Sequence, residues 1–148
     1  MTAIRVLVVD DSAFMRKVIS DIVNQGPDME VVGKARDGQD ALQKIQELNP
    51  DVVTMDVEMP GMDGLAALEQ LMKTNPVPVV MISSLTKHGA EQTFRALQLG
   101  AVDFIAKPSG QISLDIDKVK DEIIRKIKTA AGTKNKLANF KYQEVVKP

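Results

Sequence analysis

IRVLVVDDS (residues 4–12) is the stretch that decides the fold, together with PDVVTMD (residues 50–56), which repeats its pattern. Each is a short, continuous apolar run that ends in carboxylates: Asp10 and Asp11 in the first, Asp56 in the second. Such runs are typical of parallel strands buried on both faces, and ligands of open α/β sheets bind beyond the carboxyl ends of the strands. If the two runs are neighbouring strands, the three carboxylates converge on one crevice.

Apolar runs alternate with helical patterns five times along the chain, which is typical of βα units around a parallel sheet. The expected strands are 4–9, 29–35, 51–56, 77–83 and 102–105. The sequence therefore predicts an α/β fold with a five-stranded, doubly wound parallel sheet.

The helical patterns between the strands have recognisable starts and faces. Ser12 and Asp63 stand where they can cap the first and third helices. The fourth helix has an apolar pattern of Ala90, Phe94 and Leu97, which predicts that these side chains face the core.

Composition narrows the class of protein. The chain has 148 residues, of which 44% are hydrophobic, enough for one domain with a core. Its 19 basic and 20 acidic residues give a net charge of −1, which argues against a nucleic-acid-binding body. No apolar segment approaches the roughly 20 residues of a membrane span, and the N-terminus lacks a basic targeting region. The absence of cysteine excludes disulfides. We expect a soluble, cytoplasmic protein that does not insert into membranes.

The regular pattern ends near Gly132. Residues 133–148, TKNKLANFKYQEVVKP, contain four lysines, no helical stripe and a terminal proline. A segment of this kind after a compact domain is usually a linker or tail. We therefore expect one domain over 1–131 and an interdomain linker or tail over 132–148, with the output domain absent.

The carboxylate cluster predicts a metal site. Three like charges packed together repel one another, which raises a pKa or requires a cation. An oxygen-only cluster without Cys or His suits a hard ion such as Mg²⁺. Ser83 ends the fourth apolar run and Lys107 follows the fifth, so a hydroxyl and a cation are expected at the same edge. This combination is suited to phosphate chemistry.

Four motifs together resemble the receiver domain of bacterial two-component response regulators: VLVVDDS, VVTMDVEMPGMDG, VVMISS and GAVDFIAKPSG. The resemblance covers roughly residues 3–130. It implies a flavodoxin-like sheet with strand order 2-1-3-4-5, an order for which a chemotaxis receiver is one of the known examples.

The resemblance also implies roles for the site residues. Asp56 would be the nucleophile that takes a phosphoryl group from the phosphohistidine of a histidine kinase. Asp10 and Asp11 would hold Mg²⁺ with a carboxylate oxygen of Asp56 and the backbone carbonyl of Glu58. Lys107 would neutralise charge on the phosphoryl oxygens.

Two further residues would form the switch in such a receiver. Ser83 would bond the new phosphate, and Phe104 would change rotamer with that movement. Many receivers have Thr in place of Ser83, and some have Tyr in place of Phe104. Neither departure removes a group that the phosphorylation chemistry needs.

Finer matches resemble the regulatory domain of the chemotaxis protein-glutamate methylesterase: DDSAFMRKVI (10–19) and the stretch from MISSLTKHGAEQ to DFIAKPSG (81–110). In that family a linker joins the receiver to a C-terminal esterase, which demethylates glutamate methyl esters on chemoreceptors. Phosphorylation of the receiver relieves its block of the esterase. Because His88 is the only histidine and no GxSxG elbow is present, we expect no esterase activity in this fragment.

Three alternatives remain open. Within the same class, the chain could be a stand-alone or DNA-linked receiver. A Mg²⁺-dependent phosphatase of the haloacid dehalogenase type would need DxD after the first strand, where this chain has adjacent Asp10 and Asp11. A flavodoxin-like flavin protein would need a phosphate loop without carboxylates and aromatic side chains for stacking, and only 3% of residues are aromatic.

Overall fold

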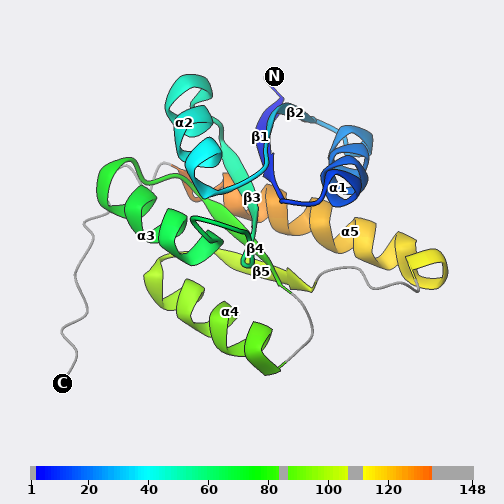
Figure 1. The fold of residues 1–148 in the computed structure, drawn as a ribbon. Coiled ribbons are helices and arrows are strands. Elements are labelled where there is room, and N and C mark those ends of the chain that lie inside the picture. Colours follow the sequence, from blue (N-terminus) through cyan, green and yellow to red (C-terminus); the bar gives the residue numbers. More distant parts are fainter. Residues whose placement is uncertain (1–2, 84–86, 107–111, 135–148) are drawn as a thin grey trace.

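The computed structural model describes residues 3–83, 87–106 and 112–134. Within them, five parallel strands form one sheet in the order β2-β1-β3-β4-β5, which confirms the predicted fold and strand order (Figure 1). The strands are β1 (Ile4–Val9), β2 (Met29–Ala35), β3 (Val52–Asp56), β4 (Val79–Ser83) and β5 (Asp103–Ala106). The helices are α1 (Ala13–Gln25), α2 (Gly38–Leu48), α3 (Gly64–Thr74), α4 (Lys87–Leu99) and α5 (Ile112–Ala131).

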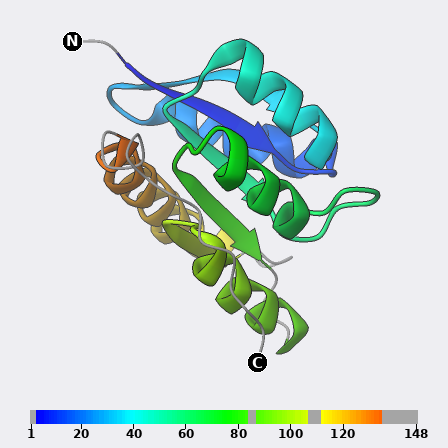
Figure 2. The ribbon, with the colours of Figure 1, turned by 90° about the vertical axis from the view of Figure 1, so that its left-hand side faces the viewer.

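Helices cover both faces of the sheet. Helices α1 and α5 lie on one face, and α2, α3 and α4 lie on the other (Figure 1). Figure 2 looks onto the second face, where α2, α3 and α4 lie side by side in that order. This two-sided cover is the reason why the strands read as continuous apolar runs and not as alternating ones.

Each strand divides its side chains between two cores, because successive side chains on a strand point to opposite faces. In β1, Leu7 and Val9 belong to the core under α2, α3 and α4, whereas Val6 and Val8 belong to the core under α1 and α5. All four are 0% exposed. The register of the sheet is thereby fixed, because a slip of one residue would exchange the two sets.

The predicted caps are confirmed. The Ser12 hydroxyl accepts a hydrogen bond from the Met15 amide at 3.3 Å, and the Asp63 carboxylate accepts one from the Ala66 amide at 2.9 Å. An oxygen at this position satisfies a backbone N–H that the first helical turn leaves without a partner. These two caps begin the helices that directly follow β1 and the loop after β3.

The predicted apolar face of α4 is wrong. Phe94 is 65% exposed and Leu97 is 37% exposed, and Ala90 is exposed as well. The buried face of α4 instead carries Thr93, at 6% exposure, and Ala96, at 0%. Small side chains at these positions let the helix lie close to the sheet, and Phe94 and Leu97 point outward.

The predicted bounds of β1 and β2 are confirmed, and those of β3, β4 and β5 differ from the prediction by one or two residues. The fourth strand begins at Val79 and not at Val77, because Pro78 lacks the N–H that a strand ladder needs. The carbonyl of Pro78 still accepts a bond from the Val53 amide at 2.9 Å. None of the helices in the described part of the chain is long and apolar enough to cross a membrane.

Helix α5 ends at Ala131. Apart from Gly132, Thr133 and Lys134, the segment expected to be a linker or tail lies outside the described residues. The division of the chain into a domain over 1–131 and a linker over 132–148 therefore stays a prediction.

Candidate functional site

Three carboxylates meet at the carboxyl edge of the sheet. Asp10 and Asp11 follow β1, and Asp56 is the last residue of β3, which is hydrogen-bonded to β1 along its length. One carboxylate oxygen of each residue lies within 4.8 Å of one from each of the others. The convergence predicted from the two apolar runs is thus present.

Burial differs among the three carboxylates. Asp10 is 0% exposed and Asp56 is 2% exposed, whereas Asp11 is exposed. The Ser12 amide donates to Asp10 Oδ1 at 2.9 Å, and the Arg16 guanidinium donates to the Asp10 carbonyl at 2.7 Å. The first turn of α1 therefore holds Asp10 in place at the floor of the site, while Asp11 lies at its solvent side.

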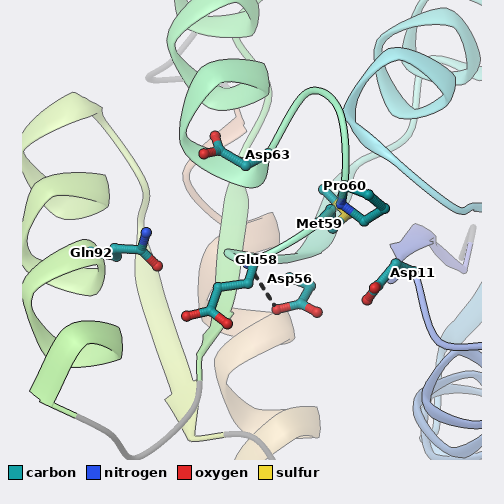
Figure 3. Close-up of a pocket in the computed structure, with 7 residues that line it drawn as sticks. All are labelled: Asp11, Asp56, Glu58, Met59, Pro60, Asp63 and Gln92. Carbon is teal, nitrogen blue, oxygen red and sulfur yellow. Dashed lines mark hydrogen bonds between the residues drawn. The ribbon is translucent and has the colours of Figure 1, made fainter.

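The loop after β3 packs closely on Asp56. The Glu58 amide donates to Asp56 Oδ1 at 3.2 Å (Figure 3). The Gly64 amide donates to the Val57 carbonyl at 3.0 Å. A Cβ added at Gly64 would lie 2.2 Å from the Asp56 carbonyl oxygen, which is too close for any side chain. Glycine at this position lets α3 begin directly against the backbone of Asp56.

A cavity of about 450 Å³ opens in front of Asp56 (Figure 3). Its lining comes from the ends of β1 and β3, the loop after β3, and α4. The lining residues are Asp11, Asp56, Glu58, Met59, Pro60, Asp63 and Gln92. The cavity thus contains four carboxylate side chains and room for a small polar ligand.

This donor set fits a hard divalent cation. Carboxylate oxygens are the ligands that Mg²⁺ and Ca²⁺ prefer, and Asp10, Asp11 and Asp56 each bring one such oxygen to a common point. Without a cation, the approach of three negative charges, two of them buried, is unfavourable. The arrangement can therefore bind a cation and, through it, an anionic ligand in the cavity.

Of the other predicted site residues, the structure describes Ser83 and Phe104 but not Lys107. Ser83 is 6% exposed and ends β4 directly after Ile82, the register partner of Asp56, so it lies at the same edge of the sheet. Phe104, on β5, is 39% exposed, and the Lys126 amine lies 5.1 Å from its ring centroid. The Lys126 amine also donates to the Phe104 carbonyl at 2.6 Å. Lys107 lies outside the described residues.

Two residues of α4 belong to this region although the sequence did not point to them. Gln92 lines the cavity, and Thr93 bonds the hydroxyl of Ser83 at 2.7 Å. The available signal was a stripe of small residues, Gly89, Thr93 and Ala96, at helical spacing. The larger Phe94 and Leu97 obscured it.

Comparisons with known proteins agree on one family. The family model of the response regulator receiver domain matches residues 6–117. A protein-glutamate methylesterase/protein-glutamine glutaminase of Syntrophomonas wolfei is 59% identical over 145 residues, which cover 97% of this chain and 41% of that protein. The crystal structure of the response regulator domain of Thermotoga maritima CheB is 55% identical with a TM-score of 0.79, and the match covers 88% of this chain and 97% of that one.

A more distant solved structure comes from a complex. A chain of the crystal structure of the P1 domain of CheA3 with CheY6 from R. sphaeroides is 34% identical, with a TM-score of 0.71. The match covers 89% of this chain and 99% of that one. The present chain spans between 35% and 42% of the length of the curated methylesterase relatives.

Proposed function

This chain belongs to the response regulator receiver family, and on that premise we propose that Asp56 accepts a phosphoryl group from a histidine kinase. The observation that carries the proposal is the meeting of three carboxylate oxygens within 4.8 Å of one another, beside a cavity of about 450 Å³ that Asp11 and Asp56 line. Asp56 stands at the end of a strand where a donor can reach it, and its backbone is fixed by the loop that follows.

The transfer is a displacement at phosphorus. An oxygen of the Asp56 carboxylate attacks the phosphoryl group of the kinase phosphohistidine, the phosphorus–nitrogen bond breaks, and the imidazole that leaves takes up a proton. The product is an acyl phosphate on Asp56. The Glu58 amide, which donates to Asp56 Oδ1 at 3.2 Å, orients the carboxylate for this attack.

Asp10, Asp11, a carboxylate oxygen of Asp56 and the backbone carbonyl of Glu58 would hold Mg²⁺ in this site. A bound Mg²⁺ ion would neutralise negative charge on the phosphoryl oxygens. The fit rests on the hard oxygen donors of the cluster. The Ser12 amide keeps Asp10 oriented toward the cluster through its bond to Oδ1.

Three residues complete the proposed mechanism. Lys107 would place its ammonium against the phosphoryl group, and Ser83 would donate its hydroxyl to a phosphoryl oxygen. The phosphoryl group would interact better with one orientation of Ser83, and the population of conformers would shift toward that orientation. Phe104 would follow by a change of rotamer. The position of Ser83 supports this role, because Ser83 directly follows Ile82, the register partner of Asp56.

Phosphorylation would control a protein-glutamate methylesterase. The methylesterase relatives are longer than this chain, and we assign the hydrolase activity to the part of those relatives that the chain does not cover. In the whole protein, the receiver would act in the cytoplasm, receive its phosphoryl group from the chemotaxis histidine kinase and regulate demethylation of chemoreceptors. The similarity to a receiver complex with a kinase P1 domain supports this donor.

Intact-protein mass after incubation with acetyl phosphate and Mg²⁺ tests the proposal. We expect one phosphoryl adduct on the wild-type chain, and none on Asp56→Asn or in the presence of EDTA. The asparagine is nearly isosteric but is a poor nucleophile, so circular dichroism should show an unchanged fold. A wild-type chain that takes up no phosphoryl group at any Mg²⁺ concentration would contradict the proposal.

A further inference from the structure

A buried chain of hydroxyl groups links the proposed switch residue to helix α4. Thr93 Oγ1 lies 2.7 Å from Ser83 Oγ and 2.8 Å from the carbonyl oxygen of Gly89, one turn earlier on the same helix. Ser83 and Thr93 are both 6% exposed. In this structure, Thr93 is thus the hydrogen-bond partner of the hydroxyl that is proposed to bind the phosphoryl group.

The proton count fixes the direction of these bonds. A threonine hydroxyl has one proton to donate and two lone pairs that accept, whereas a carbonyl oxygen can only accept. The proton of Thr93 therefore points to Gly89, and the hydroxyl of Ser83 donates to Thr93 Oγ1. The single proton of Ser83 is already used before any phosphoryl group arrives.

We infer that Thr93 is a positioning residue that holds the Ser83 hydroxyl in the unphosphorylated orientation and links its release to α4. This inference rests on the proposed function. To donate to a phosphoryl oxygen, Ser83 must give up its bond to Thr93, while the bond from Thr93 to Gly89 can remain in both states. The Ser83–Thr93 bond is therefore an interaction that favours only the unphosphorylated state.

The packing of α4 makes this link possible. Thr93 reaches Ser83 because α4 approaches the sheet through small side chains, with Gly89 and Ala96 on the same buried face. Gln92, the preceding residue, lines the cavity in front of Asp56, and Phe94, the following residue, is 65% exposed. On α4, Thr93 therefore lies between a residue that lines the cavity and a residue on the outer surface of the helix.

Affinity for beryllofluoride, a mimic of the phosphoryl group, tests the inference in the presence of Mg²⁺. Thr93→Val keeps the shape of the side chain but removes the hydroxyl, so Ser83 loses its partner only in the free protein. We expect the valine variant to bind beryllofluoride about two- to tenfold more tightly, the range that one net hydrogen bond supports. Thr93→Ser keeps the hydroxyl and should bind as the wild type does. Isothermal titration calorimetry measures the three constants.

A double-mutant cycle separates this role from a structural one. In a Ser83→Ala background there is no hydroxyl to hold, so Thr93→Val should no longer change the affinity. Thr93→Ala is the second variant if valine does not fold. Equal affinity of the wild type and Thr93→Val, or the same gain in the Ser83→Ala background, would overturn the inference. A different result would contradict the proposed function, namely the absence of a phosphoryl adduct on the wild-type chain.

Discussion

Two buried polar side chains, Thr54 and Asp56, lie on the same face of β3, because residues two apart on a strand point the same way. Asp56 stands at the end of the strand, where its carboxylate opens into the cavity and accepts a bond from the Glu58 amide. Thr54 is 0% exposed, and its hydroxyl has no hydrogen-bond partner among the described residues. Burial therefore serves the proposed chemistry at one position and costs stability at the other.

Thr54→Val is expected to raise the free energy of unfolding by about 1–3 kcal/mol, since valine has the same shape and removes the desolvated hydroxyl. Urea denaturation of the two proteins measures the difference. Thr129→Val is the matched control, because Thr129 is exposed and its hydroxyl bonds the Arg125 carbonyl at 3.0 Å. The control should show no gain. A loss of stability in Thr54→Val would mean that the hydroxyl has a partner, such as a bound water.

At the scale of single elements, β strands and helix starts could be predicted from the sequence, but the orientation of α4 could not. A strand buried on both faces is apolar at every position, so β1 and β3 stand out, and their terminal carboxylates locate the site. Helix α4 has two candidate faces. Period alone cannot decide between a face of large residues and one of small residues, because both repeat at helical spacing.

The packing of α4 also explains which site residues could not be predicted from the sequence. The carboxylates follow directly from strand ends, and Ser83 follows from the end of β4. Thr93 and Gln92 reach the site across space from a helix, and their position depends on how closely α4 packs on the sheet. That packing distance is set by side-chain volume at the contact and has no counterpart in a linear motif.

The orientation of α4 leads to a prediction about its two faces. Phe94→Gln should change the free energy of unfolding by less than about 0.5 kcal/mol, because Phe94 is 65% exposed and glutamine is a good helix former. Leu99→Ala is the control on the same helix and should cost about 2–5 kcal/mol, since Leu99 is 6% exposed. Thermal or urea denaturation compares the two. A large loss in Phe94→Gln would restore the face predicted from the sequence.

In the molecule as a whole, different groups gather at the carboxyl edge and at the amino edge of the sheet. The carboxyl edge holds the carboxylates and the cavity. At the amino edge, Asp51, just before β3, accepts bonds from the Arg5 amide at 2.9 Å and from the Lys134 amine at 2.8 Å. Lys134 follows α5, so this ion pair ties the end of the last helix to the central strands.

Electrostatics at the amino edge make this tie sensitive to acid. Partial burial acts to raise the pKa of the Asp51 carboxyl, but the hydrogen bonds from Lys134 and Arg5 and their positive charges outweigh it. The pKa of Asp51 is therefore held below its ordinary value of 3.8. A carboxylate whose pKa is lower in the folded state contributes stability above 3.8, and that contribution is lost as the pH falls through the folded value.

Lys134→Met should therefore lower the free energy of unfolding near neutral pH by about 0.2–1 kcal/mol, the usual worth of a partly exposed pair. The difference from the wild type should shrink as the pH falls below 3.8, because protonated Asp51 no longer attracts the lysine. Urea denaturation across this pH range, repeated at high salt, measures the effect. Lys128→Met, an exposed lysine on α5, is the matched control and should show no such pH dependence. A deficit in Lys134→Met that persists unchanged into acid would show that the lysine stabilises the end of α5 by packing of its aliphatic stem and not by its charge.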